Sequence, residues 1–299
     1  MAKPILLFGR DGQLGLDLAS ELASVAPVVA LGRADVDLTN AADVRRAFEV
    51  HAPAVVINAA AYTAVDAAES NADTAFAVND RAVETLARES AAHEALLVHF
   101  STDYVFDGES CRPYREEDAT SPLGVYGASK LAGERALLAS DARALIFRIS
   151  WLYARHGRNF LRTMSRLFGE GKEVRVVDDQ HGSPTWTGAV ATAVHEVLEQ
   201  ARSSSHPGRF DAANDRLGLY HLTSGEDATW FAFASAIKDS MESSGTADLV
   251  PIPTTAYPTP VRRPRSSVLN SDKAHAAFGV RLPPWREQLA EAMAIPATR

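Results

Sequence analysis

Short apolar runs alternate with segments of helical periodicity through the first half of the chain. Runs rich in aliphatic residues, the expected strands, cover residues 4–8, 27–31, 54–58, 96–101 and 145–150. Apolar positions recur at helical spacing between them, over residues 14–22, 41–49, 74–92 and 126–140. This alternation is typical of a parallel sheet with helices on both faces. It predicts an α/β fold with a Rossmann-like, doubly wound parallel sheet.

The pattern is less regular after about residue 150. Helical spacing returns at residues 159–170 and 186–201, and residues 173–177 resemble another strand. Residues 256–267 are rich in Pro and Arg, which favours extended backbone. We therefore expect residues 1–150 to form the Rossmann domain. Residues 151–299 are expected to form mainly a smaller C-terminal substrate lobe, with some segments returning to the first domain.

Composition narrows the class of protein. The 299 residues are 46% hydrophobic and 23% charged, and no apolar run reaches the ~20 residues of a membrane span. A net charge of −8 argues against a nucleic-acid binder, so we expect neither nucleic acid nor membrane as partner. Cys111 is the only cysteine, which excludes an internal disulfide. With no signal-peptide pattern at the N-terminus, we expect a cytoplasmic protein.

A glycine-rich turn follows the first expected strand and opens the first expected helix. Gly9, Gly12 and Gly15 form the pattern Gly-x-x-Gly-x-x-Gly, which also contains Gln13 and Leu14. Glycines in such a turn let the backbone approach a pyrophosphate, and the helix N-terminus supplies N–H donors to the anion. The strand–turn–helix context predicts that residues 1–150 bind a dinucleotide.

The next two strand ends would line the rest of the cofactor. Arg33 follows the second strand, where an acidic residue would select NAD; an arginine suits a 2′-phosphate, so NADPH is slightly favoured over NADH. Arg33 is equally compatible with an exposed loop. Asp37 and Leu38 are candidates to flank the adenine. Small residues, among them Ala60 and Ala61, follow the third strand. Their short side chains would let the backbone lie against a flat ligand.

Tyr126 and Lys130 are four residues apart on an expected helix and so share one face. The ordinary pKa of a phenol is about 10, and a nearby ammonium group would lower it toward neutral pH. A hydroxyl at Thr102, at the end of the fourth strand, joins the pair at the carboxyl edge of the sheet. Thr102, Tyr126 and Lys130 are the predicted catalytic residues, and the trio resembles the working set of the short-chain dehydrogenase/reductases.

Further stretches narrow the resemblance to one family within the extended branch of that superfamily, the dTDP-4-dehydrorhamnose reductases. The matching stretches are residues 9–15, 58–66, 101–107, 121–122, 125–127, 130–134, 148–151, 159–160, 178–180, 182–185, 220–222 and 263–264. The resemblance implies an NAD(P)H-dependent oxidoreductase. It would reduce the C4 keto group of dTDP-4-dehydro-β-L-rhamnose to give dTDP-β-L-rhamnose, in the last step of dTDP-L-rhamnose biosynthesis for a bacterial cell envelope polysaccharide.

The resemblance also implies roles for single residues. Thr102 would hydrogen-bond the substrate oxygen, Tyr126 would transfer a proton, and Lys130 would hold the cofactor ribose and lower the tyrosine pKa. The residues implied to contact the cofactor are Ala61, Tyr62 and Thr63. Those implied or assigned to contact the dTDP-sugar are Thr102, Asp103, Trp151, Asn159 and Arg263. Two roles are equally supported for Arg263: it binds the diphosphate, or it lies in a solvated basic loop.

Members of this family include proteins that bind Mg²⁺ between subunits through glutamates. Asp17 lies near the first of those positions, but residues 186–189 carry no carboxylate and Glu291 is loosely placed. We therefore predict no metal site, while a homodimer stays open. Two alternatives also stay open: a reductase of another 4-keto-6-deoxy nucleotide sugar, and a non-catalytic regulatory subunit with the same fold.

Overall fold

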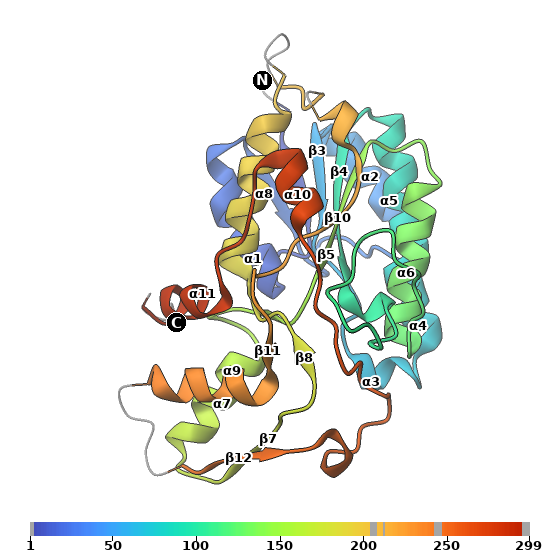
Figure 1. The fold of residues 1–299 in the computed structure, drawn as a ribbon. Coiled ribbons are helices and arrows are strands. Elements are labelled where there is room, and N and C mark those ends of the chain that lie inside the picture. The colour runs from blue at the N-terminus through green and yellow to red at the C-terminus, as the bar shows by residue number, and fades with distance from the viewer. Residues whose placement is uncertain (1–2, 204–207, 212, 242–246, 295–299) are drawn as a thin grey trace.

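A computed structural model describes residues 3–203, 208–211, 213–241 and 247–294, and its centre is a six-stranded sheet (Figure 1). The strand order is β10-β5-β4-β3-β1-β2, and every pairing is parallel. The strands are β1 (Ile5–Phe8), β2 (Val28–Leu31), β3 (Val55–Asn58), β4 (Leu96–Thr102), β5 (Ala144–Ile149) and β10 (Gly218–His221). The predicted α/β class with a Rossmann-like parallel sheet is confirmed.

The strand order reverses at β1. From β1 the chain passes to β2 on one side, then crosses back to β3 on the other side. Strands β1 and β3 are fully buried because helices cover both faces of the sheet, which explains their unbroken apolar sequences. A crevice forms at such a reversal, outside the carboxyl ends of the strands. The turns after β1 and β3 therefore face the same space.

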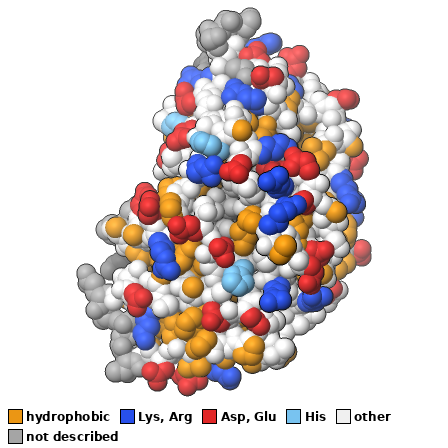
Figure 2. Space-filling model, in the orientation of Figure 1, with side chains coloured by type: hydrophobic (Ala, Val, Ile, Leu, Met, Phe, Trp, Pro, Cys, Tyr) orange, Lys and Arg blue, Asp and Glu red, His pale blue; other side chains and the backbone are white. Residues whose placement is uncertain are grey.

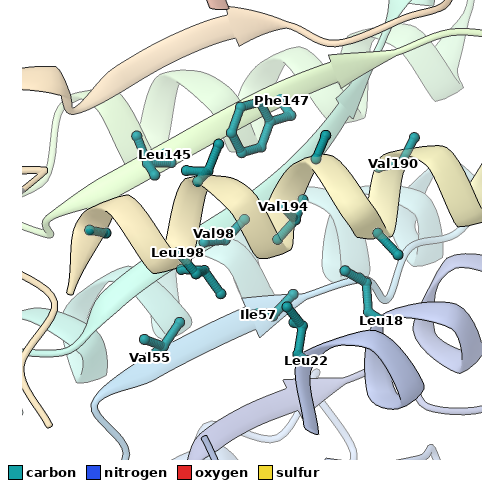
Figure 3. Packing of buried hydrophobic residues seen from close by; sticks show 14 of the residues in the cluster. Leu18, Leu22, Val55, Ile57, Val98, Leu145, Phe147, Val190, Val194 and Leu198 are labelled. Carbon is teal, nitrogen blue, oxygen red and sulfur yellow. The ribbon is translucent and has the colours of Figure 1, made fainter. Parts of the chain in front are cut away.

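Helices pack against both faces of the sheet (Figure 1). One layer contains α1 (Gln13–Glu21), α8 (Thr187–Ala201) and α10 (Asp272–Phe278). In Figure 3, Val190, Val194 and Leu198 of α8 lie over the sheet, whose strands contribute Ile57 and Val98. The other layer contains α2 (Ala41–His51), α5 (Ala82–Ala92) and α6 (Val125–Leu138). Strand β10 thus belongs to the central sheet and helix α8 packs on it, although both lie far along the chain.

The helix expected over residues 74–92 is interrupted. It consists of α4 (Ala72–Phe76), a π-helical turn η2 (Ala77–Arg81) and α5. Asn79 lies in this turn and is buried, and its amide bonds the backbone N and O of Tyr62 and the Ser129 hydroxyl at 2.9, 3.0 and 3.0 Å. A π turn often marks a functional segment of a helix. Here it directs a side chain toward the loop after β3.

A second core lies below the sheet in Figure 1. It packs α7 (Phe160–Gly169) and α9 (Trp230–Asp239) on the parallel pair β7 (Val174–Val177) and β12 (Leu249–Ile252). The remaining elements are short strands β6 (Leu152–Tyr153), β8 (His181–Gly182), β9 (Thr185–Trp186) and β11 (Ala228–Thr229), helices α3 (Val65–Ala68) and α11 (Trp285–Ala294), and single turns η1 (Leu22–Ser24), η3 (Asp103–Val105), η4 (Asn214–Arg216) and η5 (Thr254–Ala256).

Charged side chains of both signs are interspersed over the coloured part of the face shown in Figure 2. This view shows no extended region of one sign there, and such a region would be the usual footprint of a nucleic-acid surface. None of the helices in the described ranges is both long and apolar enough to cross a membrane.

The side chain that caps the N-terminus of helix α2 belongs to Asn40 and not to the preceding residue, Thr39. The Asn40 Oδ1 atom accepts a hydrogen bond from Ala42 N at 3.0 Å, whereas the Thr39 hydroxyl donates to Asp37 Oδ1 at 2.7 Å. We expect Asn40→Ala to lower the free energy of unfolding by about 1 kcal/mol, measured by urea denaturation, because one N-terminal N–H loses its partner. Thr39→Ala is the matched control, and a larger loss in that variant would contradict the assignment of the cap.

Candidate active site

A cleft of about 1070 Å³ follows the carboxyl edge of the sheet from the glycine-rich turn to the second core. Most of the residues predicted from the sequence line it. They are Gly9, Gly12, Gln13, Leu14, Arg33, Asp37, Leu38, Ala60, Ala61, Tyr62, Thr63, Thr102, Asp103, Tyr126, Lys130, Trp151 and Asn159. Two predicted residues, Gly15 and Arg263, are not part of its lining. The cleft is therefore built by segments that span most of the chain.

The glycine-rich turn lies directly against the loop after β3. Gly9 has a φ of +91°, and a Cβ there would be 2.6 Å from Ala60 N. A Cβ on Gly15 would be 2.0 Å from the Gly9 carbonyl oxygen. Gly15 therefore lets helix α1 pack on the turn, in place of the ligand contact predicted for it. Gly12 caps α1, so the first N–H groups of the helix face the cleft and suit a pyrophosphate.

Arg33, Asp37 and Leu38 also line the cleft, at the end where the chain leaves β2. Asp37 accepts hydrogen bonds from the side chain and the backbone N of Thr39, and these bonds lower the Asp37 pKa. The exposed Arg33 guanidinium adds a smaller lowering effect. This end carries a cation next to a fixed carboxylate, which is an arrangement suited to ribose hydroxyls and a 2′-phosphate.

One contact at this end was missed from the sequence. The Asp35 carboxylate accepts from Gly32 N at 2.8 Å and pairs with Arg10 at 3.0 Å. This pair ties the glycine-rich turn to the end of β2. An Asp three residues after the glycine that follows the strand was the available signal, but its partner could not be read from spacing.

Buried asparagines hold the loop after β3. Asn58 ends that strand and accepts a hydrogen bond from Ala60 N at 3.2 Å. Asn79 bonds both backbone polar groups of Tyr62. These contacts fix the backbone next to the predicted cofactor residues. Neither asparagine was among the residues predicted from the sequence, where only their polarity at expected buried positions distinguishes them.

Thr102, Tyr126 and Lys130 meet at the centre of the cleft, where β4 ends and α6 begins. Lys130 is almost fully buried, and its Nζ donates to Phe100 O at 2.7 Å and lies 3.3 Å from His99 Nε2. Burial lowers the Lys130 pKa to about 8. Lys130 thus contacts the strand behind the site, while Lys130 and Tyr126 both line the cleft.

The expectation that Lys130 lowers the Tyr126 pKa is not met. Tyr126 keeps part of its surface in the cleft, yet loss of solvent raises its pKa, and the charge of Asp103 adds to this effect. A hydrogen bond with Thr102 opposes the rise. The hydroxyl of Tyr126 is therefore fully protonated at neutral pH, as a proton donor must be.

Asp103 is 1% exposed, and both of its carboxylate oxygens have partners. The Thr102 hydroxyl donates to Asp103 Oδ1 at 3.0 Å, and the Ser150 hydroxyl donates to Oδ2 at 2.8 Å. The single hydroxyl proton of Thr102 is thus directed at Asp103, away from a donation into the cleft.

Two tryptophans form the wall at the second core. Trp151 has a φ of +45° and its ring stacks on Trp230, with centroids 3.5 Å apart and planes at 3°. A Cβ on Gly182 would be nearest the Trp151 ring-fusion carbon, at 2.2 Å, so Gly182 lies against the ring. Both indoles line the cleft. Trp230 was missed from the sequence because nothing local distinguishes it from a buried aromatic residue.

The remaining predicted substrate residues have structural partners. The Asn159 Oδ1 atom accepts from Arg162 N at 3.1 Å and its amide donates to Ala154 O at 2.8 Å, which caps helix α7. Arg263 pairs with Asp66 at 2.7 Å, and its side chain is 16% exposed. Arg263 is thus held by a carboxylate next to the cleft.

The described residues form no group of three or more His, Cys, Asp or Glu side chains that could hold a metal ion. The Asp17 and Glu291 positions considered from the sequence contribute to no such group within the described ranges.

Comparison with known proteins gives one consistent result. Residues 2–297 match the family model for the RmlD substrate binding domain. The chain is 45% identical to the dTDP-4-dehydrorhamnose reductase of Burkholderia thailandensis, covering 94% of this chain and 95% of that protein. It is 39% identical to the enzyme of the same name from Escherichia coli K12, covering 94% of each.

Solved structures agree with these relatives. The dTDP-4-dehydrorhamnose reductase of Bacillus anthracis, in complex with NADP, superposes with a TM-score of 0.88 at 30% identity, covering 98% of this chain and 99% of that one. The corresponding protein of Clostridium acetobutylicum gives 0.88 at 34% identity, covering 97% and 98%. A UDP-glucose 4-epimerase of Thermus thermophilus, at 20% identity and a TM-score of 0.79, shares the fold.

Proposed function

The chain belongs to the dTDP-4-dehydrorhamnose reductase family, and on that basis we propose that it reduces the C4 keto group of dTDP-4-dehydro-β-L-rhamnose with NADPH or NADH. The product is dTDP-β-L-rhamnose. One observation carries the proposal: the cleft joins a dinucleotide turn to Thr102, Tyr126 and Lys130 in a chain that is 45% identical to a named reductase over 94% of its length. The retained trio argues against a non-catalytic subunit.

The residues of the cleft fit a nicotinamide dinucleotide. A Cβ on Gly9 would be 2.6 Å from Ala60 N, so glycine lets the turn lie against the loop after β3, and Gly12 begins α1, whose N-terminus faces the cleft. Ala60 and Ala61 offer a flat backbone surface beyond this turn. When bound, the reduced cofactor supplies the hydride for the carbonyl carbon.

The chain itself supplies the proton and the electrostatic support. Tyr126 donates its phenolic proton to the oxygen that becomes the C4 hydroxyl. Lys130, held by Phe100 O, places an amine next to the cofactor half of the cleft. The aromatic wall at Trp151 gives the sugar an apolar surface. The compartment we propose is the cytoplasm, which holds the reduced cofactors.

The direct test is NADPH oxidation, followed by absorbance, with dTDP-4-dehydro-L-rhamnose made in situ. We expect turnover with this substrate that exceeds turnover with other 4-keto-6-deoxy nucleotide sugars. Faster reduction of one of those sugars would favour the alternative reductase. A folded protein that binds NADPH and reduces none of them would favour the regulatory subunit.

Arg33 tests the cofactor preference. We expect Arg33→Ala to raise the KM for NADPH about tenfold and to leave the KM for NADH within about twofold, because only NADPH carries the 2′-phosphate. Arg46→Ala is the matched control, since Arg46 is an exposed arginine that pairs with Asp43 on α2, outside the cleft lining. Equal effects of Arg33→Ala on both cofactors would contradict the assignment.

A further inference from the structure

A row of buried polar side chains lies behind the cleft, from the end of β3 to Lys130. Asn58, His99 and Lys130 are all buried, and His99 lies on β4 between the other two. The His99 Nδ1 atom is 3.1 Å from Asn58 Nδ2, and its Nε2 atom is 3.3 Å from Lys130 Nζ. His99 is not part of the cleft lining. It can therefore act on the proposed reaction only through Lys130.

Asn58 decides which nitrogen of His99 carries the proton. The backbone N–H of Ala60 donates to Asn58 Oδ1 at 3.2 Å, so the amide oxygen faces the loop and the amide nitrogen faces His99. An amide nitrogen donates and does not accept. His99 Nδ1 must therefore accept, and in a neutral imidazole the proton then lies on Nε2. Burial lowers the His99 pKa well below its ordinary value, which keeps the ring neutral.

The proton on His99 Nε2 is directed at Lys130. The Lys130 Nζ atom donates to Phe100 O at 2.7 Å, and it can accept from His99 only through the lone pair of an uncharged amine. An ammonium group has three N–H donors and no acceptor, so it would meet the His99 N–H donor to donor. Every donor in the row, from Ala60 N to Lys130 Nζ, has an acceptor only when Lys130 is uncharged.

His221 has the opposite arrangement in the same structure. Its Nε2 atom lies 3.3 Å from Arg148 Nη1, and its Nδ1 atom lies 3.1 Å from the carbonyl oxygen of Tyr114. A carbonyl oxygen only accepts, so the proton of His221 lies on Nδ1, and Nε2 accepts from the guanidinium. The ring next to Arg148 is thus oriented for a permanent cation, whereas the ring next to Lys130 is not.

We propose that His99 is a positioning residue: Asn58 holds it in the Nε2–H form, and in that form it donates to Lys130 and favours the uncharged amine in the cofactor-free protein. An uncharged Lys130 leaves Tyr126 without an adjacent ammonium group, so the phenol stays protonated for the reduction. One N–H of the amine stays available to a ribose hydroxyl of the cofactor. The consequence for turnover rests on the proposed function, whereas the protonation of the two side chains does not.

The other groups around Lys130 leave this preference in place. Burial lowers the Lys130 pKa to about 8, and Glu134, four residues further along α6, is the charged group that opposes the lowering. Both Glu134 oxygens are bonded by Arg148 of β5, at 2.9 and 2.7 Å. The Asp103 carboxylate of η3 is held by two hydroxyl groups, and Asn79 of η2 carries no charge. The His99 N–H, directed at the amine, lowers the Lys130 pKa further.

Nuclear magnetic resonance of the cofactor-free protein, labelled with ¹⁵N and ¹³C, tests the proposal without an enzymatic assay. The ring nitrogen shifts of each histidine report which nitrogen carries the proton, and sequential backbone assignment identifies each ring. We expect His99 to carry its proton on Nε2 and His221 to carry its proton on Nδ1, so one spectrum contains both the test and its control. A His99 proton on Nδ1, or a doubly protonated His99 ring, at neutral pH would overturn the proposal.

A second measurement follows the Lys130 amine. The chain has only five lysines, so their ¹⁵N and ¹³C side-chain signals can be resolved and titrated. His99→Phe keeps a flat ring and removes both nitrogens, and we expect it to raise the midpoint of the Lys130 titration by about one pH unit, because the amine loses the donor that favours its uncharged form.

A Lys130 midpoint that is unchanged or lower in His99→Phe would also overturn the proposal. Where this variant does not fold, the position of the His99 proton in wild type decides alone. A wild-type protein that reduces no keto-sugar would count against the proposed function and would leave both spectroscopic results unaffected.

Discussion

Replacement of Tyr126 by Phe is expected to lower kcat about 10²- to 10⁴-fold, the range that one positioned proton donor contributes. The variant loses only the phenolic oxygen. The ring keeps its edge-to-face contact with Tyr104, at a centroid distance of 5.8 Å, so the shape of the cleft should persist. NADPH oxidation with dTDP-4-dehydro-L-rhamnose measures the loss. NADPH affinity, measured by fluorescence titration, should change less than about threefold.

Tyr104→Phe provides the matched control. Tyr104 is the other tyrosine at the centre of the cleft, and it lies two residues after Thr102. The Tyr104 hydroxyl forms its side-chain hydrogen bond with Arg263 and not with Thr102, and the Asp66 charge also acts on it. We expect this variant to lose less than about tenfold in kcat. The opposite ranking, with Tyr104→Phe the more damaged, would move the proton donor to Tyr104.

Glu134→Gln is expected to lower the free energy of unfolding by about 3–5 kcal/mol, because it leaves a buried charge without its partner. Glu134 on α6 and Arg148 on β5 form a bidentate pair at 2.9 and 2.7 Å, and their side chains are 1% and 3% exposed. His221 and Phe106 enclose the guanidinium at 3.3 and 5.0 Å. Burial and the Arg148 charge lower the His221 pKa to about 3, so His221 stays neutral and adds no second positive charge, and Glu134 alone offsets the Arg148 charge among these groups.

Urea denaturation of Glu134→Gln beside wild type measures this loss. The control is the double variant Glu134→Leu with Arg148→Met, which removes both charges and fills the space with apolar groups. We expect it to regain most of the lost stability, as isosteric replacement of a buried ion pair often does. A single variant within about 1 kcal/mol of wild type would show that the pair contributes little to holding α6, the helix of Tyr126 and Lys130, on the sheet.

The sequence by itself determined the helices and strands, and the chemistry that depends on residues close together along the chain. Fully apolar runs such as Ile5–Phe8 identified the buried parallel strands, since only a doubly covered sheet buries both faces of a strand. The spacing of Gly9, Gly12 and Gly15 identified the dinucleotide turn. Tyr126 and Lys130 fell on one helix next to Thr102 because the strand and the helix were both predicted correctly.

Tertiary structure decided what those residues do once other segments enclose them. Trp230 meets Trp151 across 79 positions of the sequence, and Ser150 meets Asp103 across 47. No periodicity encodes such contacts, because they depend on how two cores pack. The predicted direction of the Tyr126 pKa shift was wrong for the same reason: helical spacing puts Lys130 one turn away, but the Lys130 amine is bonded to β4, and burial and the Asp103 charge raise the Tyr126 pKa. Sequence periodicity fixes which face of an element is apolar, whereas desolvation and long-range pairing exist only in the folded chain.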